Sequence, residues 1–138
     1  MARILAIDIG SKLCGLAWSD PLQIIASHLN SVDRRELIKT IETLLKDGTV
    51  ETIVVGYPKK LNGEPTHMTA PAEALKQELE KKFNLPVVLW DERFTSQMAF
   101  NTLLESNVSK KKRQDKDLIN AVSATIILQS YLDSLPRK

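Results

Sequence analysis

Two patterns of apolar residues divide the chain into predicted strands and helices. Short runs rich in β-branched residues are typical of strands, whereas apolar residues that recur every three or four positions are typical of helices. Two strands are expected within residues 3–20, and three more over 22–29, 52–56 and 87–90. Helices are expected from Asp33 to about 47, from about Pro71 to 83, after Thr95 and Ser96, and over about 116–132.

The order of these elements predicts an α/β fold with a mixed sheet. Three strands that follow one another as a meander, and then alternating helices and strands, give a sheet with helices on its faces. The strands that end at Asp8 and Trp90 are both expected to be central. If parallel, they bring Asp8 and the pair Asp91–Glu92 to the edge of the sheet where α/β folds bind ligands.

Asp8 is the one charged side chain in the otherwise apolar run from Ile4 to Ile9. A buried carboxylate costs free energy unless a cation or hydrogen-bond donors compensate it. A metal ion would do so, and the alternative is that Asp8 only bonds the N–H groups of the following turn. Gly10, two positions on, would let a ligand approach the backbone closely.

Several carboxylates from separate elements, with few His or Cys residues, favour a hard divalent cation such as Mg²⁺ or Mn²⁺. Such ions can activate water for phosphodiester hydrolysis. The sequence shows no catalytic triad, no Cys/His zinc spacing and no Walker-type phosphate loop. These absences leave a carboxylate metal site as the candidate chemistry.

The composition is that of one globular domain over residues 1–138, with a net charge of +2. A balance this mildly basic means that any contact with nucleic acid must come from a local patch. The single cysteine, Cys14, suits a reducing compartment, and no apolar run has transmembrane length. We therefore expect a cytoplasmic protein that does not enter a membrane.

Two basic segments are candidates for that patch. Five of the eight residues 109–116 are basic, and a long loop over 57–66 contains Lys59 and Lys60. Beside an acidic catalytic centre such charges would hold phosphates. The alternative for both segments is a solvated surface loop.

Four motifs, in order, closely resemble the bacterial YqgF family, which is also called RuvX-like. They are Ala6–Gly10 with Gly15, Val55–Pro58 with Asn62–Gly63, Trp90–Ser96, and Ser123–Leu132. The resemblance covers nearly the whole chain, and the four motifs are far more specific together than singly. It implies a ribonuclease H-like fold with a five-stranded mixed sheet flanked by helices.

The resemblance also implies an activity. The family is described as a nuclease that matures the 5′ end of pre-16S ribosomal RNA, and was first described as a Holliday junction resolvase. Metal-binding acids are then expected at Asp8 and Glu92. The partners would be structured RNA in a ribosomal precursor particle, or branched DNA, bound by a monomer or homodimer. Phosphate contacts are expected from Lys59, Lys60, Arg93, Lys110, Lys111, Lys112 and Arg113.

One position departs from the family pattern. The third acid of the family falls at Asn120, which offers a neutral oxygen but no negative charge. Asp117, three residues earlier on the same helix face, is a candidate to compensate, as is Asp115. The departure leaves open a catalytically impaired RNA-binding assembly factor. A sugar-kinase-like ATPase is a more distant alternative, because this chain has room for one lobe and those enzymes need two.

Overall fold

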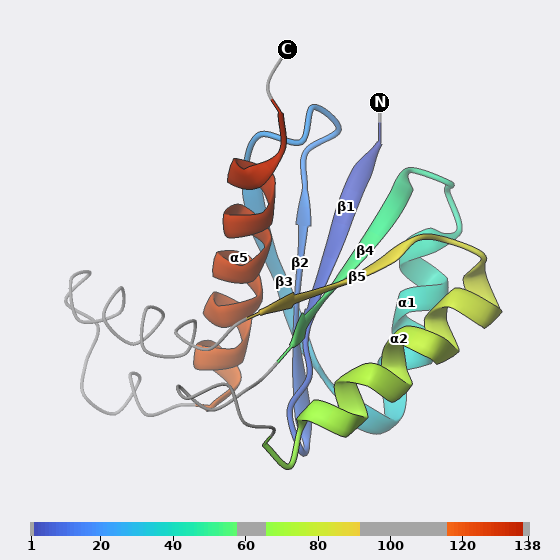
Figure 1. The fold of residues 1–138 in the computed structure, drawn as a ribbon, viewed down its shortest axis with the longest axis vertical. Coiled ribbons are helices and arrows are strands. Elements are labelled where there is room, and N and C mark those ends of the chain that lie inside the picture. Colours follow the sequence, from blue (N-terminus) through green and yellow to red (C-terminus); the bar gives the residue numbers. More distant parts are fainter. Residues whose placement is uncertain (1, 58–65, 92–115, 137–138) are drawn as a thin grey trace, which may run out of the picture.

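The computed structural model describes residues 2–57, 66–91 and 116–136, and these form one five-stranded mixed sheet with helices on both faces (Figure 1). This confirms the architecture expected from the order of elements. The strands are β1 (Arg3–Asp8), β2 (Leu13–Ser19), β3 (Ala26–Asp33), β4 (Val50–Tyr57) and β5 (Val87–Asp91). The helices are the 3₁₀ turn η1 (Arg34–Glu36), α1 (Leu37–Leu45), α2 (Thr69–Phe83) and α5 (Lys116–Ser134).

The strand order is β3-β2-β1-β4-β5, which puts β1 in the middle of the sheet. β1 is parallel to β4, and β4 is parallel to β5. β2 is antiparallel to both of its neighbours, β1 and β3. Two reversals make β3 parallel to β1. The carboxyl ends of β1, β3, β4 and β5 therefore lie at one edge of the sheet, which we call the carboxyl edge.

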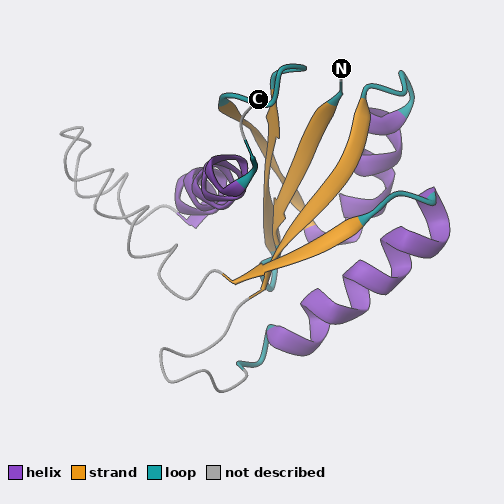
Figure 2. Ribbon diagram, turned by 45° about the horizontal axis from the view of Figure 1, so that its top comes forward, coloured by secondary structure: helices purple, strands orange, loops and turns teal. Residues whose placement is uncertain are grey.

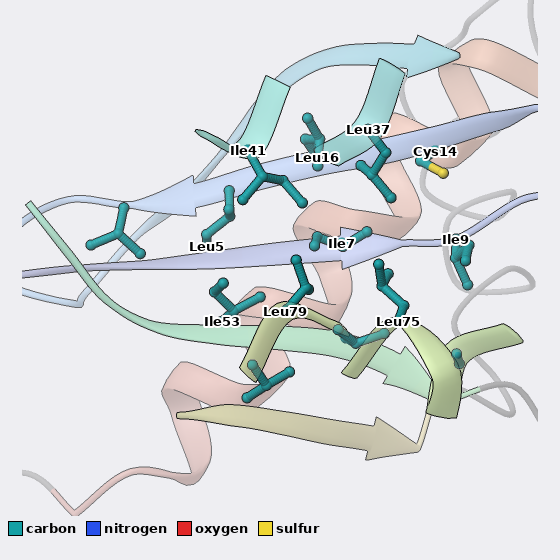
Figure 3. Packing of buried hydrophobic residues seen from close by; sticks show 14 residues of the cluster. Leu5, Ile7, Ile9, Cys14, Leu16, Leu37, Ile41, Ile53, Leu75 and Leu79 are labelled. Atoms are coloured by element: carbon teal, nitrogen blue, oxygen red, sulfur yellow. The ribbon is translucent and has the colours of Figure 1, made fainter. Parts of the chain in front are cut away.

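Two apolar cores lie on opposite faces of the sheet. Successive strand residues point to opposite faces. Leu5 and Ile7 accordingly pack on the α1/α2 side, in the larger core shown in Figure 3. Ile4 and Ala6 instead pack against α5. The alternation along β1 thus decides which core each side chain joins.

Local features of the chain mark the ends of the helices. Asp33 accepts a hydrogen bond from the Arg35 backbone N–H (2.8 Å) and so caps η1. Gly48, just beyond α1, has a φ of +70°. Asn84 ends α2 in the left-handed conformation. Asp33 thus caps the turn that leads into α1, and residues in the left-handed conformation follow both α1 and α2.

The third strand lies about four residues later than the expected 22–29. Asp20 accepts hydrogen bonds from the backbone N–H groups of Leu22, Ile24 and Ile25. Gln23 has a φ of +59°. The Asp20 carboxylate therefore closes a tight loop over residues that the apolar pattern predicts to be part of a strand. As a result, β3 begins only at Ala26.

The expectation that the strand ending near Trp90 is central is wrong. Within the described residues β5 pairs only with β4 and forms an edge of the sheet. Its burial agrees, because Val87 is buried whereas Val88, Leu89 and Trp90 are half-buried. β4 therefore separates β5 from β1.

α5 covers the face of the sheet opposite α1 and α2 (Figure 2). Four of its described apolar side chains are buried against the sheet: Ala124, Ile127, Leu128 and Leu132. Ser130 and Asp133 are exposed on its outer side. Among the described helices, none combines the length and apolar character needed to cross a membrane.

Candidate functional site

Asp8 ends the central strand β1, at the carboxyl edge of the sheet. It is buried, with 9% of its surface exposed. It shares strand parity with Ile4 and Ala6, which pack against α5, so it belongs to the α5 side of the sheet. The expected carboxylate in a core strand is thus present, at the edge where α/β folds bind ligands.

The ends of the neighbouring strands surround Asp8 at this edge. Gly15 of β2 lies directly opposite Asp8. On the other side, Tyr57 ends β4 and pairs with Asp91 at the end of β5. The Tyr57 hydroxyl donates a hydrogen bond to Glu73 of α2 (3.1 Å), and this bond raises the pKa of Tyr57. Tyr57 is therefore an anchor for α2 rather than an acid.

An aromatic contact joins the end of β5 to α5. The Trp90 and Tyr131 rings meet edge to face, with centroids 5.3 Å apart. The Trp90 indole N–H also donates to the Ser130 hydroxyl (3.2 Å). These contacts hold the strand that leads toward Glu92 against the helix that carries positions 117 and 120.

α5 begins at the carboxyl edge and runs antiparallel to β1 (Figure 1). Late in the helix, the Gln129 side chain accepts from the Ala26 N–H (3.1 Å) and donates to the Ile24 carbonyl (3.2 Å). Ala26 begins β3, at the opposite edge of the sheet. The first turns of α5, which include Asp117 and Asn120, are therefore at the end of the helix nearer Asp8.

The structure describes only part of the expected site. Asp8 is described in full, and Asp117 and Asn120 fall within α5, but their side chains lie outside the described part. Among the described residues, no group of three His, Cys, Asp or Glu side chains is placed to hold a metal ion. The other expected site residues lie outside the described residues: Lys59, Lys60, Glu92, Arg93, Lys110, Lys111, Lys112 and Arg113.

Cys14 is a core residue, as its apolar strand predicts. It is fully buried, and burial raises the pKa of its thiol. A hydrogen bond from the Gly10 backbone N–H and the charge of Arg34 act in the opposite direction, while the charge of Asp8 adds to the rise. The thiol is thus neutral at physiological pH, which excludes it as a thiolate nucleophile.

Sequence reasoning missed two cations at the carboxyl edge. Lys12 directly precedes β2, and Arg34 directly follows β3. Both are exposed. The signal was available, because a strand parallel to β1 must end at the edge where Asp8 lies. Placing that strand over 22–29 left Arg34 in the expected helix and hid its position.

Curated relatives match this chain over nearly its whole length. A protein from Bacteroides fragilis named "Putative pre-16S rRNA nuclease" is 45% identical over 135 residues, which are 97% of this chain and 98% of that protein. Proteins of the same name from Bacteroides thetaiotaomicron and Christiangramia forsetii are 46% and 44% identical to this chain. Each match spans 98% of the relative's length.

Solved structures show the same fold at low sequence identity. The Fowlpox virus resolvase, in complex with Holliday junction DNA, has a TM-score of 0.58 at 12% identity and covers 98% of this chain and 99% of its own. RuvC from T. thermophilus, with a Holliday junction substrate, has a TM-score of 0.57 at 13% identity, over 97% and 98% of the two chains. These likenesses show a ribonuclease H-like fold.

A family model described as RuvX, Holliday junction resolvase, matches residues 2–134. That range includes all four sequence motifs and every described strand and helix. Together with relatives about 45% identical along the whole chain, the match is decisive. The chain belongs to the RuvX (YqgF) family of nucleases.

Proposed function

We propose that this protein is a metal-dependent nuclease that processes the 5′ end of pre-16S ribosomal RNA by phosphodiester hydrolysis. The observation that carries the proposal is the buried Asp8 carboxylate at the carboxyl edge of the central strand. The names of relatives 44–46% identical to the chain supply the substrate. We further propose that the protein acts in the cytoplasm on a ribosomal precursor particle.

The donor set proposed for the metal consists of oxygens. Asp8 and Glu92 would be its ligands, and Asn120 and Asp117 would flank them. Carboxylate and amide oxygens suit Mg²⁺ or Mn²⁺. Burial of Asp8 supports this fit, because a carboxylate with 9% exposure is stabilised by a cation close to it. A bound divalent ion would lower the pKa of water and stabilise the charge of the leaving oxygen.

The chain's own residues have two tasks in this reaction. Asp8 holds a fixed negative charge at the rigid end of a central strand, so that no reorganisation is needed when the substrate binds. Basic side chains offset the charge of the substrate backbone, and for this we propose Lys59, Lys60, Arg93 and residues 110–113. The contact between the Trp90 and Tyr131 rings holds the end of β5 against α5.

Resolution of Holliday junctions is the second candidate. The description of the matching family names that activity, and both solved resolvases above are complexes with such junctions. A resolvase makes paired cuts and would act as a symmetric dimer. A third candidate, an RNA-binding assembly factor with an impaired site, is supported by Asn120.

One cleavage assay separates the three candidates. The protein is incubated with a pre-16S rRNA fragment that spans the mature 5′ end, and in parallel with a four-way DNA junction, each with and without Mg²⁺. We expect metal-dependent cleavage of the RNA that is lost in Asp8→Asn. Cleavage of the junction alone would favour the resolvase. Activity that appears only in Asn120→Asp would show an impaired site, and no cleavage by either form would overturn the nuclease proposal.

A further inference from the structure

Lys12 and Arg34 form a cationic pair that is fixed to the sheet by backbone contacts. The Arg34 N–H donates to the Lys12 carbonyl (2.8 Å). The strands that they flank are paired beside them, with Leu13 opposite Asp33. The two backbones are thus set relative to each other, while both side chains are exposed.

The pair lines a hollow in the surface. It has a volume of about 640 Å³, and the described residues that line it are Ser11, Lys12, Asp33, Arg34 and Arg35. Asp33 is engaged by Arg35, whose Nε lies 3.1 Å from its carboxylate, and this contact lowers the pKa of Asp33. Among these described lining residues, one of the three cations therefore neutralises the one acid. Lys12 and Arg34 give the described lining of the hollow a net positive charge.

A second, smaller hollow lies beside Arg34 on the α1/α2 face of the sheet, the face opposite the one to which Asp8 belongs. It has a volume of about 150 Å³, and both Arg34 and Ile9, the residue after Asp8, line it. The charges of Arg34 and Asp8 also both act on the Cys14 thiol. Neighbouring strands are about 5 Å apart, so β3 lies roughly 10 Å from β1 along this edge. In a stacked strand that distance is about three nucleotide steps, at roughly 3.4 Å of axial rise per step.

We propose that Lys12 and Arg34 bind the phosphodiester backbone of the substrate nucleic acid, a few nucleotides from the phosphate that is cleaved at Asp8. The inference rests on the proposed function for the position of the cut, but the binding itself does not depend on catalysis. Arg34 presents a planar fork suited to two phosphate oxygens, and Lys12 adds a point charge. Substrate would then run along the carboxyl edge from the β3 side across β1.

Binding without metal tests this site separately from cleavage. A short fluorescein-labelled single-stranded RNA and the DNA of the same sequence are titrated by anisotropy, in EDTA, over a series of salt concentrations. The variants are Lys12→Ala, Arg34→Ala and the double variant. The matched control is Lys46→Ala, because Lys46 is an exposed cation just after α1, where the chain turns toward the start of β4 at the opposite edge.

We expect the double variant to bind RNA roughly ten-fold more weakly than wild type. The slope of log K against log salt should fall by about 0.7 for each phosphate contact that is lost. Lys46→Ala should bind as wild type does, and Arg34→Lys should keep the salt slope. An equal loss on DNA would show that the site reads the shared phosphate backbone, and a loss on RNA alone would restrict it to RNA.

Two results would overturn the inference: wild-type affinity and salt slope in the double variant, or an equal loss in Lys46→Ala. The outcome is independent of the proposed function. Wild-type protein that binds through Lys12 and Arg34 but cleaves nothing would refute the nuclease and keep the site. A double variant that cleaves normally and binds as wild type does would refute the site and keep the nuclease.

Discussion

The indole of Trp90 stands nearly perpendicular to the phenol ring of Tyr131, with an interplanar angle of 88° and ring centroids 5.3 Å apart. Trp90 is the last residue but one of β5, and Tyr131 lies in the second half of α5. In the described residues β5 has one strand neighbour, β4. The aromatic contact therefore supports an edge strand that pairing secures from one side only.

Replacement of Trp90 should destabilise the protein in two separable steps. Trp90→Phe keeps an aromatic ring but removes the hydrogen bond to Ser130, and we expect a loss of about 0.5–1 kcal/mol. Trp90→Ala also removes the edge-to-face contact and half-buried area, and we expect about 2 kcal/mol in total. Chemical denaturation monitored by far-UV circular dichroism measures both.

Ser130→Ala is the control for the hydrogen bond. It removes the same bond from the other side, so the double variant Trp90→Phe/Ser130→Ala should cost no more than the larger single change. Fully additive losses would contradict the proposed role of the bond. Unchanged stability in Trp90→Ala would contradict the role of the contact as a whole.

Asp8→Asn should separate catalysis from stability. The proposed metal ligand loses its charge, so we expect cleavage to fall by at least about a hundred-fold. The amide keeps the size of the side chain and one acceptor oxygen, so the free energy of unfolding should change far less than cleavage does. Cleavage of the pre-16S fragment and urea denaturation give the two readings.

Asp91→Asn is the matched control for Asp8→Asn. Asp91 is an exposed acid at the same edge, and its strand parity is opposite to that of Trp90, which packs on the α5 side. We expect this variant to keep its activity. Equal losses in the two variants would show that general acidity of the edge matters, and not a specific site at Asp8.

Much of the fold could be predicted from the sequence, because the spacing of apolar residues indicates each element and the order of the elements indicates the architecture. β4 and α2 lie close to their expected ranges, since each is a strongly patterned run, and Asn84 gives α2 a clear end. β3 was misplaced because apolar character at Leu22–Ile25 imitates a strand. A single carboxylate, Asp20, overrides that preference by binding three backbone N–H groups.

The candidate site was predictable only where chemistry and pattern coincide. Asp8 stands out because a charge interrupts an apolar strand. The position of β5 at the edge of the sheet could not be predicted in the same way. The order of strands depends on which strand each crossover connection places beside which, and a short apolar run has the same pattern in either position. Lys12 and Arg34 became visible only once the direction of β3 was known.

The loop that follows β2 should lose its order in acid. Hydrogen bonds from backbone N–H groups, that of Ile25 first, hold the pKa of Asp20 below its ordinary value of 3.8. A depressed pKa stabilises the folded loop above the ordinary value, and this contribution is lost as the pH falls through the lower, folded pKa. The amide resonances of Ile24 and Ile25 should therefore shift together below about pH 4, with a midpoint under 3.8.

Asp20→Asn provides the control for this titration. The amide still accepts hydrogen bonds but does not ionise in this range. The two isoleucine amides should then show no step below pH 4, while the amide of Thr49, which bonds Asp47, should still titrate. A persistent step in Asp20→Asn would assign the transition to another group.

Two buried serines should respond to alanine substitution with opposite signs. Ser19 is fully buried, and its hydroxyl accepts from the Ile4 N–H (3.0 Å) and donates to the Asp20 carbonyl (2.9 Å). Ser19→Ala leaves the buried Ile4 N–H without that acceptor, so we expect a loss of about 1–3 kcal/mol. Ser123 is 1% exposed, and its hydroxyl has no hydrogen-bond partner within the described part of the chain.

Ser123→Ala removes a buried hydroxyl that makes no hydrogen bond within the described residues, and it introduces a better helix former into α5. We expect stability to be unchanged or to rise by up to about 1 kcal/mol, which is a few degrees in Tm for a domain of this size. Thermal unfolding of both variants beside wild type tests the contrast. A large loss in Ser123→Ala would mean that its hydroxyl is bonded in solution, and the buried face of α5 would then hold a polar contact near its first turns.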